Sequence, residues 1–147
     1  AKRQEDLAYL YELSLGTIGG AQPQTELFKI LAELDLPKTE LREVPESIGT
    51  MKELRRISLE NNGLRNLPES LGKLSKLKKI NLGHNLFEEF PSVVTELPKL
   101  EDLALDRNKL TTIPDKVGTM KKMRRLKLAR NKIGHLPQTF ENLSGLH

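Results

Sequence analysis

The sequence predicts an α/β solenoid with a parallel β-sheet on its concave side and short helices or 3-10 turns on its convex side. Three observations lead to this fold class: a period of 23 residues, a strand-like alternation of leucines in each period, and an apolar–proline pair that follows the alternation. One period is too short to bury its own apolar face. Stacked periods must therefore share one continuous core.

The period is clearest in five blocks of 23 residues, which we call repeats one to five. They open at Leu31, Leu54, Leu77, Leu100 and Met123. Apolar residues occupy the first, fourth, sixth and eleventh places of every repeat, and an apolar–Pro pair ends at the fifteenth place. The ninth place holds Asn in repeats two to five, at Asn62, Asn85, Asn108 and Asn131, and it holds Thr39 in repeat one.

Each part of the period has a physical explanation. The fourth and sixth places are two apart, which is the spacing of inward-facing residues on a strand. The proline fixes φ and begins the return path on the convex side. The remaining residues have room for only a turn or two of helix, and apolar residues such as Leu71 and Leu74 are three apart, as one inward-facing helical stripe requires.

With these features the chain resembles the leucine-rich repeat family, in the class whose unit reads LxxLxLxxNxLxxLPxxIxxLxxL. The resemblance covers residues 31–145. It implies a curved right-handed superhelix. It also implies an asparagine ladder, in which Asn62, Asn85, Asn108 and Asn131 hydrogen-bond backbone groups at successive turns. Because the hydroxyl of Thr39 can supply only part of this bonding, we expect a weaker first rung.

Residues 1–30 are less regular, and two interpretations stay open. They form either a helical cap or a degenerate repeat in which Leu10, Leu13 and Leu15 reproduce the LxxLxL spacing. Glycines at positions 16, 19 and 20 suit a strand and turns better than a long helix. We therefore expect a cap or degenerate repeat over residues 1–30, five repeats over 31–145, and the start of a truncated further repeat at 146–147.

The two ends of the chain suggest that it belongs to something larger. The chain begins at Ala1 rather than Met, and Leu146 stands where a new repeat would open. Solenoids usually need a polar cap for solubility, and none follows. We expect either a longer protein, or an open C-terminal end that is covered by a partner or by self-association with a second copy.

Signatures of common enzyme classes are absent from the sequence, including the nucleophile elbow, the Gly-rich nucleotide-binding loops and the zinc-protease motif. The chain has no cysteine and three histidines. We expect His84 in a binding patch and His135 in a solvated loop. The sequence therefore predicts no enzymatic activity, no cofactor and no metal.

Binding residues are expected between the inward-facing leucines. The second, third, fifth, seventh and eighth places of each repeat should face the concave side or its rim, and the net charge of +4 is gathered there. These places are basic in repeats two and three, acidic in repeat four and strongly basic in repeat five. The alternative is that they are the solvated residues that any soluble sheet carries. The residues assigned to protein binding are Arg56, Ser58, Glu60, Lys79, Asn81, His84, Asp102, Asp106, Arg107, Arg125, Lys127 and Arg130.

The leading hypothesis for function is a protein-interaction module, a scaffold or the recognition part of a signalling or effector protein, whose partner has an acidic surface. One alternative is a polyanion or nucleic-acid binder that uses the basic concave patches. Against specific nucleic-acid recognition stand the acidic residues of repeat four and the lack of an aromatic residue for base stacking. Another alternative is a structural or regulatory segment of a larger enzyme.

Localisation is predicted to be cytoplasmic. No signal peptide opens the chain, no apolar run approaches the roughly 18 residues of a membrane helix, and cysteine is absent. A secreted bacterial effector is the alternative.

Overall fold

The computed structural model describes residues 32–36 and 38–146. The two interpretations of residues 1–30 concern a segment outside the described residues.

Within the described residues, five short strands form one parallel sheet in chain order. They are β1 (Glu33–Asp35), β2 (Arg56–Ser58), β3 (Lys79–Asn81), β4 (Asp102–Ala104) and β5 (Arg125–Lys127). Residues 23 positions apart lie opposite one another, so that Ile57 pairs with Leu34 on one side and with Ile80 on the other. The predicted parallel sheet is confirmed, because the period places equivalent residues side by side.

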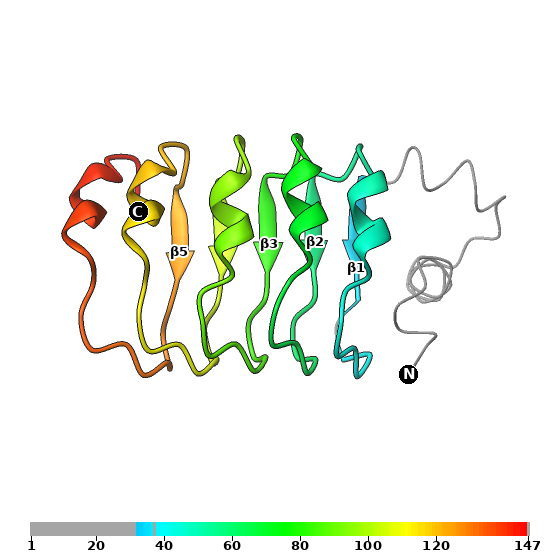
Figure 1. The fold of residues 1–147 in the computed structure, drawn as a ribbon, viewed down its shortest axis with the longest axis horizontal. Helices are drawn as coiled ribbons and strands as arrows, with labels where there is room; N and C mark the ends of the chain where they lie inside the picture. Colours follow the sequence, from blue (N-terminus) through cyan, green and yellow to red (C-terminus); the bar gives the residue numbers. More distant parts are fainter. Residues whose placement is uncertain (1–31, 37, 147) are drawn as a thin grey trace, which may run out of the picture.

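A 3-10 helix of five residues follows each strand. These helices are η2 (Glu46–Thr50), η3 (Glu69–Lys73), η4 (Ser92–Glu96), η5 (Asp115–Thr119) and η6 (Gln138–Asn142). The proline of the apolar–Pro pair directly precedes each of them, with φ between −67° and −73°. Figure 1 shows the helices side by side in front of the sheet. Strands pack closer together than helices do, so the sheet lies on the concave side, as predicted.

The core runs between the sheet and the helices. The central residue of each strand points into it, and Leu34, Ile57, Ile80 and Leu103 are at most 3% exposed. Phe87 fills the eleventh place of repeat three and is fully buried. The equivalent residues of repeat five, such as Leu126 and Ile133, are only partly buried against this core.

The ninth-place asparagines join successive repeats. In repeat three the Asn85 side chain donates to the carbonyls of Leu59 and Leu82, both at 3.0 Å, and its Oδ1 accepts the Leu64 N–H at 3.0 Å. Asn85 is only 4% exposed. None of the buried side-chain nitrogen and oxygen atoms in the described part of the chain lacks a hydrogen-bond partner. The asparagines therefore satisfy backbone groups that the turns would otherwise leave unpaired.

Thr39 replaces part of this bonding in repeat one. Its hydroxyl lies 3.4 Å from the Leu36 carbonyl and 3.0 Å from Oδ1 of Asn62. A hydroxyl carries one hydrogen, so it can donate to only one of the two oxygens at a time. Asn62, by contrast, donates to both Leu36 and Leu59. The first rung thus has fewer donors, which agrees with the expectation from the sequence.

Neighbouring convex helices pack closely where a glycine of one faces a hydroxyl residue of the next. A methyl group at Gly118 would stand 2.6 Å from Cβ of Thr139, and one at Gly49 would stand 2.8 Å from Cβ of Ser70. The Thr139 hydroxyl donates to the Asp115 carbonyl at 2.8 Å, and the Ser70 hydroxyl likewise donates to the carbonyl of Glu46. The hydroxyl bond and the missing side chain together allow the close approach.

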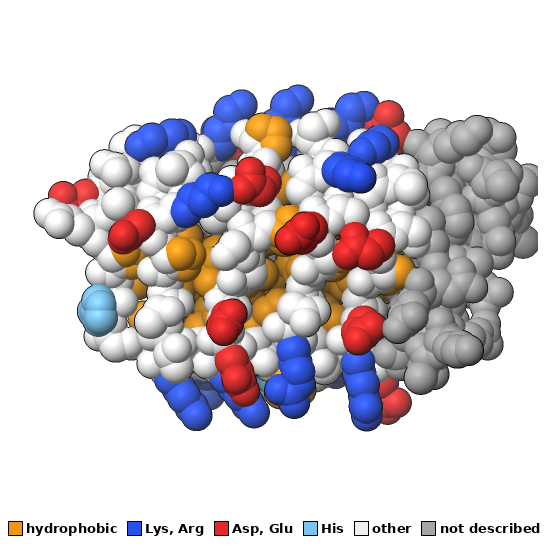
Figure 2. Space-filling view, viewed as in Figure 1, with side chains coloured by type: hydrophobic (Ala, Val, Ile, Leu, Met, Phe, Trp, Pro, Cys, Tyr) orange, Lys and Arg blue, Asp and Glu red, His pale blue; other side chains and the backbone are white. Residues whose placement is uncertain are grey.

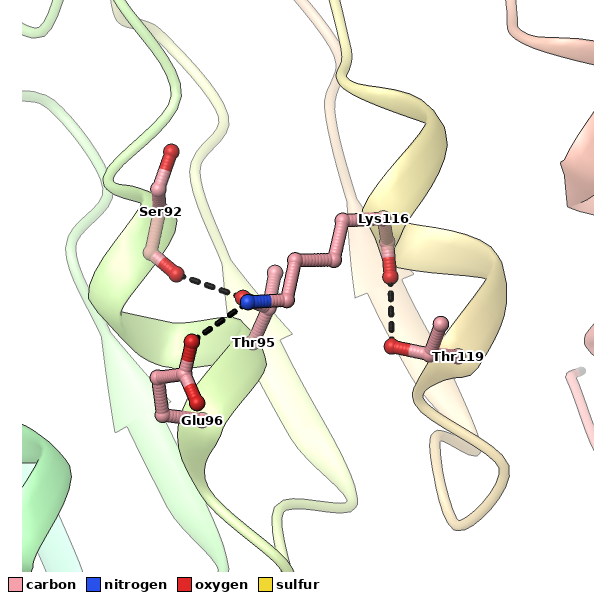
Figure 3. A network of polar contacts seen from close by, with 5 residues as sticks. All are labelled: Ser92, Thr95, Glu96, Lys116 and Thr119. Atoms are coloured by element: carbon pink, nitrogen blue, oxygen red, sulfur yellow. Dashed lines mark hydrogen bonds and ion pairs between the residues drawn. The ribbon is translucent and has the colours of Figure 1, made fainter.

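The junction between η4 and η5 is built differently. Thr95 stands where the other junctions have glycine, and Lys116 stands where they have Ser70, Val93 or Thr139. Figure 3 shows Lys116 reaching from η5 to the carboxylate of Glu96 on η4. The Thr95 hydroxyl donates within its own helix, to the Ser92 carbonyl. An exposed ion pair therefore replaces the close helix contact at this junction.

Candidate binding surface on the concave sheet

Two rows of side chains cover the concave face, because the third and fifth places of each repeat flank the inward-pointing central residue of a strand. The third-place row contains Glu33, Arg56, Lys79, Asp102 and Arg125. The fifth-place row contains Asp35, Ser58, Asn81, Ala104 and Lys127. Most of the predicted binding residues on strands therefore lie on one continuous surface.

Within the third-place row, ion pairs connect side chains of neighbouring strands. Asp102 lies between two cations, with its carboxylate 3.8 Å from Lys79 Nζ and 3.9 Å from an Arg125 guanidinium nitrogen. Glu33 lies 3.7 Å from Arg56. Asp102 is 24% exposed and Arg125 is 69% exposed, so the anion lies low and the cations project. Asp102 of β4 therefore separates the two basic patches less than its charge in the sequence suggested, because it is paired with a cation on each side.

A shallow hollow lies across β2 to β5 on the concave face. Its volume is about 160 Å³, and its lining includes Ala104, which pairs with Asn81 on β3 and with Lys127 on β5. The charged groups that line it are Arg56, Lys79, Asp102, Arg125 and Lys127. Four of these five side chains are cations, so the hollow suits a negatively charged group.

Sequence reasoning missed the part that Ala104 plays, because it ranked residues by charge. The usable signal was size: alanine is the smallest side chain in the fifth-place row. A small residue between two longer ones leaves a depression in a sheet surface.

Ser58 departs from the expectation for a binding residue. It is on the predicted face but only 6% exposed, since its short side chain lies between Asp35 and Asn81 on the adjacent strands. Its hydroxyl offers little surface to a partner. Asn81 is also engaged, because its Oδ1 accepts the Gly83 N–H at 3.0 Å and its amide lies 3.4 Å from the Glu60 carboxylate.

The remaining predicted binding residues lie beyond the strands. His84, Arg107 and Arg130 all have φ of 57°, and they stand in consecutive turns directly before the ladder asparagines. All three are exposed at the rim. Asp106 lies against Gly83 of the previous repeat, where an added methyl group would be 3.1 Å from the Asp106 carboxylate. These residues form a rim beside the sheet rather than part of its surface.

The described residues contain no group of three or more His, Asp or Glu side chains arranged to hold a metal ion. No helix in the described part of the chain has the length and apolar character needed to cross a membrane.

Comparison with known proteins identifies the family. A family model described as a leucine-rich repeat region matches residues 17–147. The chain belongs to the leucine-rich repeat family. Searching the curated proteins finds no match.

Solved leucine-rich repeat structures resemble this chain over part of their length. The leucine-rich repeat protein LIC12759 of Leptospira interrogans is 35% identical with a TM-score of 0.76, and the match covers 80% of this chain and 30% of that one. The APL1 leucine-rich repeat domain is 21% identical with a TM-score of 0.74, covering 84% and 34%. The plant peptide hormone receptor RGFR1, in complex with RGF2, is 25% identical with a TM-score of 0.57, covering 71% and 21%. The chain thus spans about a third or less of these structures.

Proposed function

We propose that this leucine-rich repeat chain is a protein-interaction module, and that the hollow over Ala104 binds an acidic segment of a partner protein. The observation that carries the proposal is the set of four cations, Arg56, Lys79, Arg125 and Lys127, around one small residue on an otherwise continuous sheet. The receptor RGFR1, a more distant structural relative, is described in complex with RGF2. The proposed role is that of a cytoplasmic scaffold or recognition segment.

The geometry explains how such a segment would be held. A carboxylate in the hollow would meet Lys79 and Arg125, whose positions Asp102 already restrains, so less side-chain freedom is lost on binding. Lys127, on β5, would contact a second carboxylate of the partner segment. Among the residues that the structure describes, no aromatic side chain lines the hollow to anchor the partner by burial. Binding should therefore rest on electrostatic attraction and weaken as the ionic strength rises.

A charge-reversal experiment tests the proposal. The probe is a short fluorescent poly-glutamate peptide, and its affinity is measured by fluorescence anisotropy at low ionic strength. Arg125→Glu with Lys127→Glu should weaken binding by at least about tenfold, because two attractive exposed pairs become repulsive.

A matched control separates the hollow from net charge. Lys109 and Lys132 are exposed, follow the ladder asparagines and make no ion pair within the described residues. Lys109→Glu with Lys132→Glu changes the net charge by the same amount and should change the affinity by less than about threefold. Equal weakening in both double variants would show that the peptide responds only to overall charge, and the proposed site would be wrong.

A further inference from the structure

The edge of the sheet at which the strands begin carries a second concentration of positive charge. Three lysines, Lys76, Lys99 and Lys122, share the last place of successive repeats, and Arg55 and Lys78 share the second place. Figure 2 shows Lys and Arg side chains gathered along this edge, at the top of the view. The parallel register places equivalent residues at the strand spacing of about 4.8 Å. The edge is distinct from the concave hollow over Ala104.

These five cations surround a hollow of about 230 Å³, and among the described residues Glu101 is the only other one that lines it. The Glu101 carboxylate is engaged by Arg124, at 3.5 Å. Lys76 bonds Glu53 at 2.6 Å. Within the described part of the chain, Arg55, Lys78, Lys99 and Lys122 make no ion pair.

The surroundings of Glu53 also reflect the positive potential at this edge. The hydrogen bond and charge of Lys76, and to a smaller extent the charge of Arg55, lower the pKa of the Glu53 carboxyl. Cations held this close repel one another in the free protein. An anion bound among them would relieve that repulsion in addition to forming new ion pairs.

The lining distinguishes this hollow from the concave one. Every described side chain around it is charged, whereas Ala104 and three aliphatic residues also line the concave hollow. The one large apolar side chain that is strongly exposed in the described residues, Leu136, lies outside this hollow. The edge therefore offers nothing to the apolar part of a peptide or to the interior of a membrane. It suits a compact ligand that is charged throughout.

We propose that the edge hollow formed by Arg55, Lys76, Lys78, Lys99 and Lys122 binds a small ligand that carries several linked phosphate groups. Phosphate groups present many acceptor oxygens at high charge density, which match the three donors of each lysine and the fork of the arginine. Cations from three successive repeats can contact neighbouring phosphates at once. This surface does not depend on the concave site, and either could exist without the other.

Isothermal titration calorimetry with sodium tripolyphosphate at low ionic strength tests the proposal. Lys99→Glu with Lys122→Glu should weaken binding by at least about tenfold, because two attractive pairs become repulsive. Glu53→Gln frees Lys76 from its ion pair and should strengthen binding by about twofold. Lys109→Glu with Lys132→Glu, which changes the net charge equally, should alter the affinity by less than about threefold.

Three outcomes would overturn the proposal. The first is an equal loss of affinity in the edge variant and in the Lys109 and Lys132 control, which would mean unspecific attraction. The second is a loss of tripolyphosphate binding in the concave variant Arg125→Glu with Lys127→Glu while the edge variant still binds. The third is binding to vesicles of phosphatidylserine and phosphatidylcholine, or to a short DNA duplex, with none to tripolyphosphate. The poly-glutamate assay reads the concave site separately, so each proposal can fail alone.

Discussion

Asn108 shows how a single side chain can connect three backbone segments. Its amide donates to the carbonyls of Leu82 and Leu105 at 3.0 and 3.1 Å, and its Oδ1 accepts the Phe87 N–H at 3.0 Å. Two of these groups belong to the preceding repeat. The asparagine thus ties the turn of its own repeat to the turn before it.

Replacing this side chain tests how much the ladder contributes to stability. Asn108→Ala should lower the free energy of unfolding by about 2–4 kcal/mol, because it leaves a buried N–H and buried carbonyls without partners. Asn108 is only 7% exposed. Urea denaturation followed by circular dichroism gives the measurement.

Asn131 provides the control at the same place of repeat five. It makes the same kinds of bond, to Leu105, Leu128 and the Leu110 N–H, but it is only partly buried. Water can replace its bonds, so Asn131→Ala should cost about 1 kcal/mol. Similar losses in the two variants would mean that burial does not determine the strength of a rung.

The period predicts which residues enter the core, but it does not predict every surface residue. Inward-facing places follow from a spacing that is independent of the neighbouring repeats. The exposure of Ser58, by contrast, depends on the lengths of Asp35 and Asn81, which stand 23 residues away on either side. The left-handed backbone of His84 and Arg107 was also not predicted, because neither residue type signals positive φ as glycine does.

At the scale of elements, the convex helices differ in how closely they approach. Close junctions combine a glycine on one helix with a hydroxyl donor on the next, as at Gly118 and Thr139. Gly72 faces Val93 instead, and a methyl group there would meet Cγ2 of Val93 at 3.4 Å, an ordinary contact. Two glycines at the same place of the repeat therefore have different amounts of room.

This difference gives a prediction with a built-in control. Gly118→Ala should lower the free energy of unfolding by about 1–3 kcal/mol, because the added methyl group overlaps the backbone and side chain of Thr139. Gly72→Ala should stay within about 1 kcal/mol of the unaltered chain, since reduced freedom of the unfolded chain offsets the mild contact. Thermal and urea denaturation of both variants give the comparison. A larger loss for Gly72→Ala than for Gly118→Ala would contradict the packing explanation.

The short convex helices were predictable from the proline and the limited chain length, but their packing was not. The sequence shows Gly49, Gly72 and Gly118 at one place and Thr95 at the same place of repeat three. It does not show that the helix carrying Thr95 is joined to the following helix, η5, by an ion pair between Glu96 and Lys116. That relation appears only when two successive repeats are placed side by side.

At the scale of the whole molecule, the distribution of surface charge depends on ion pairs between successive repeats more than on the net charge of each repeat. When the charges of the concave and rim places are summed within each repeat, the fourth repeat is acidic. Across the sheet, however, its Asp102 pairs with Lys79 and Arg125, and its Glu101 pairs with Arg124. The positive charge that remains collects at the concave hollow and at the edge where the strands begin. A count along the sequence cannot show this, because paired residues stand 23 places apart.

The stacked architecture also predicts an uneven stability along the chain. Each repeat contacts only its neighbours, so local opening depends on how completely a repeat is covered. Ile80, Leu82 and Phe87 of repeat three are at most 3% exposed, whereas the equivalent residues of repeat five are only partly buried. Hydrogen exchange measured by mass spectrometry on this chain should therefore show peptides from residues 124–146 exchanging at least about tenfold faster than those from residues 78–100. The same gradient should steepen in Asn108→Ala, because that change removes a bond network between repeats three and four. Equal protection in both segments would instead mean that the repeats open together as one cooperative unit, with coupling between neighbours stronger than the difference in their burial.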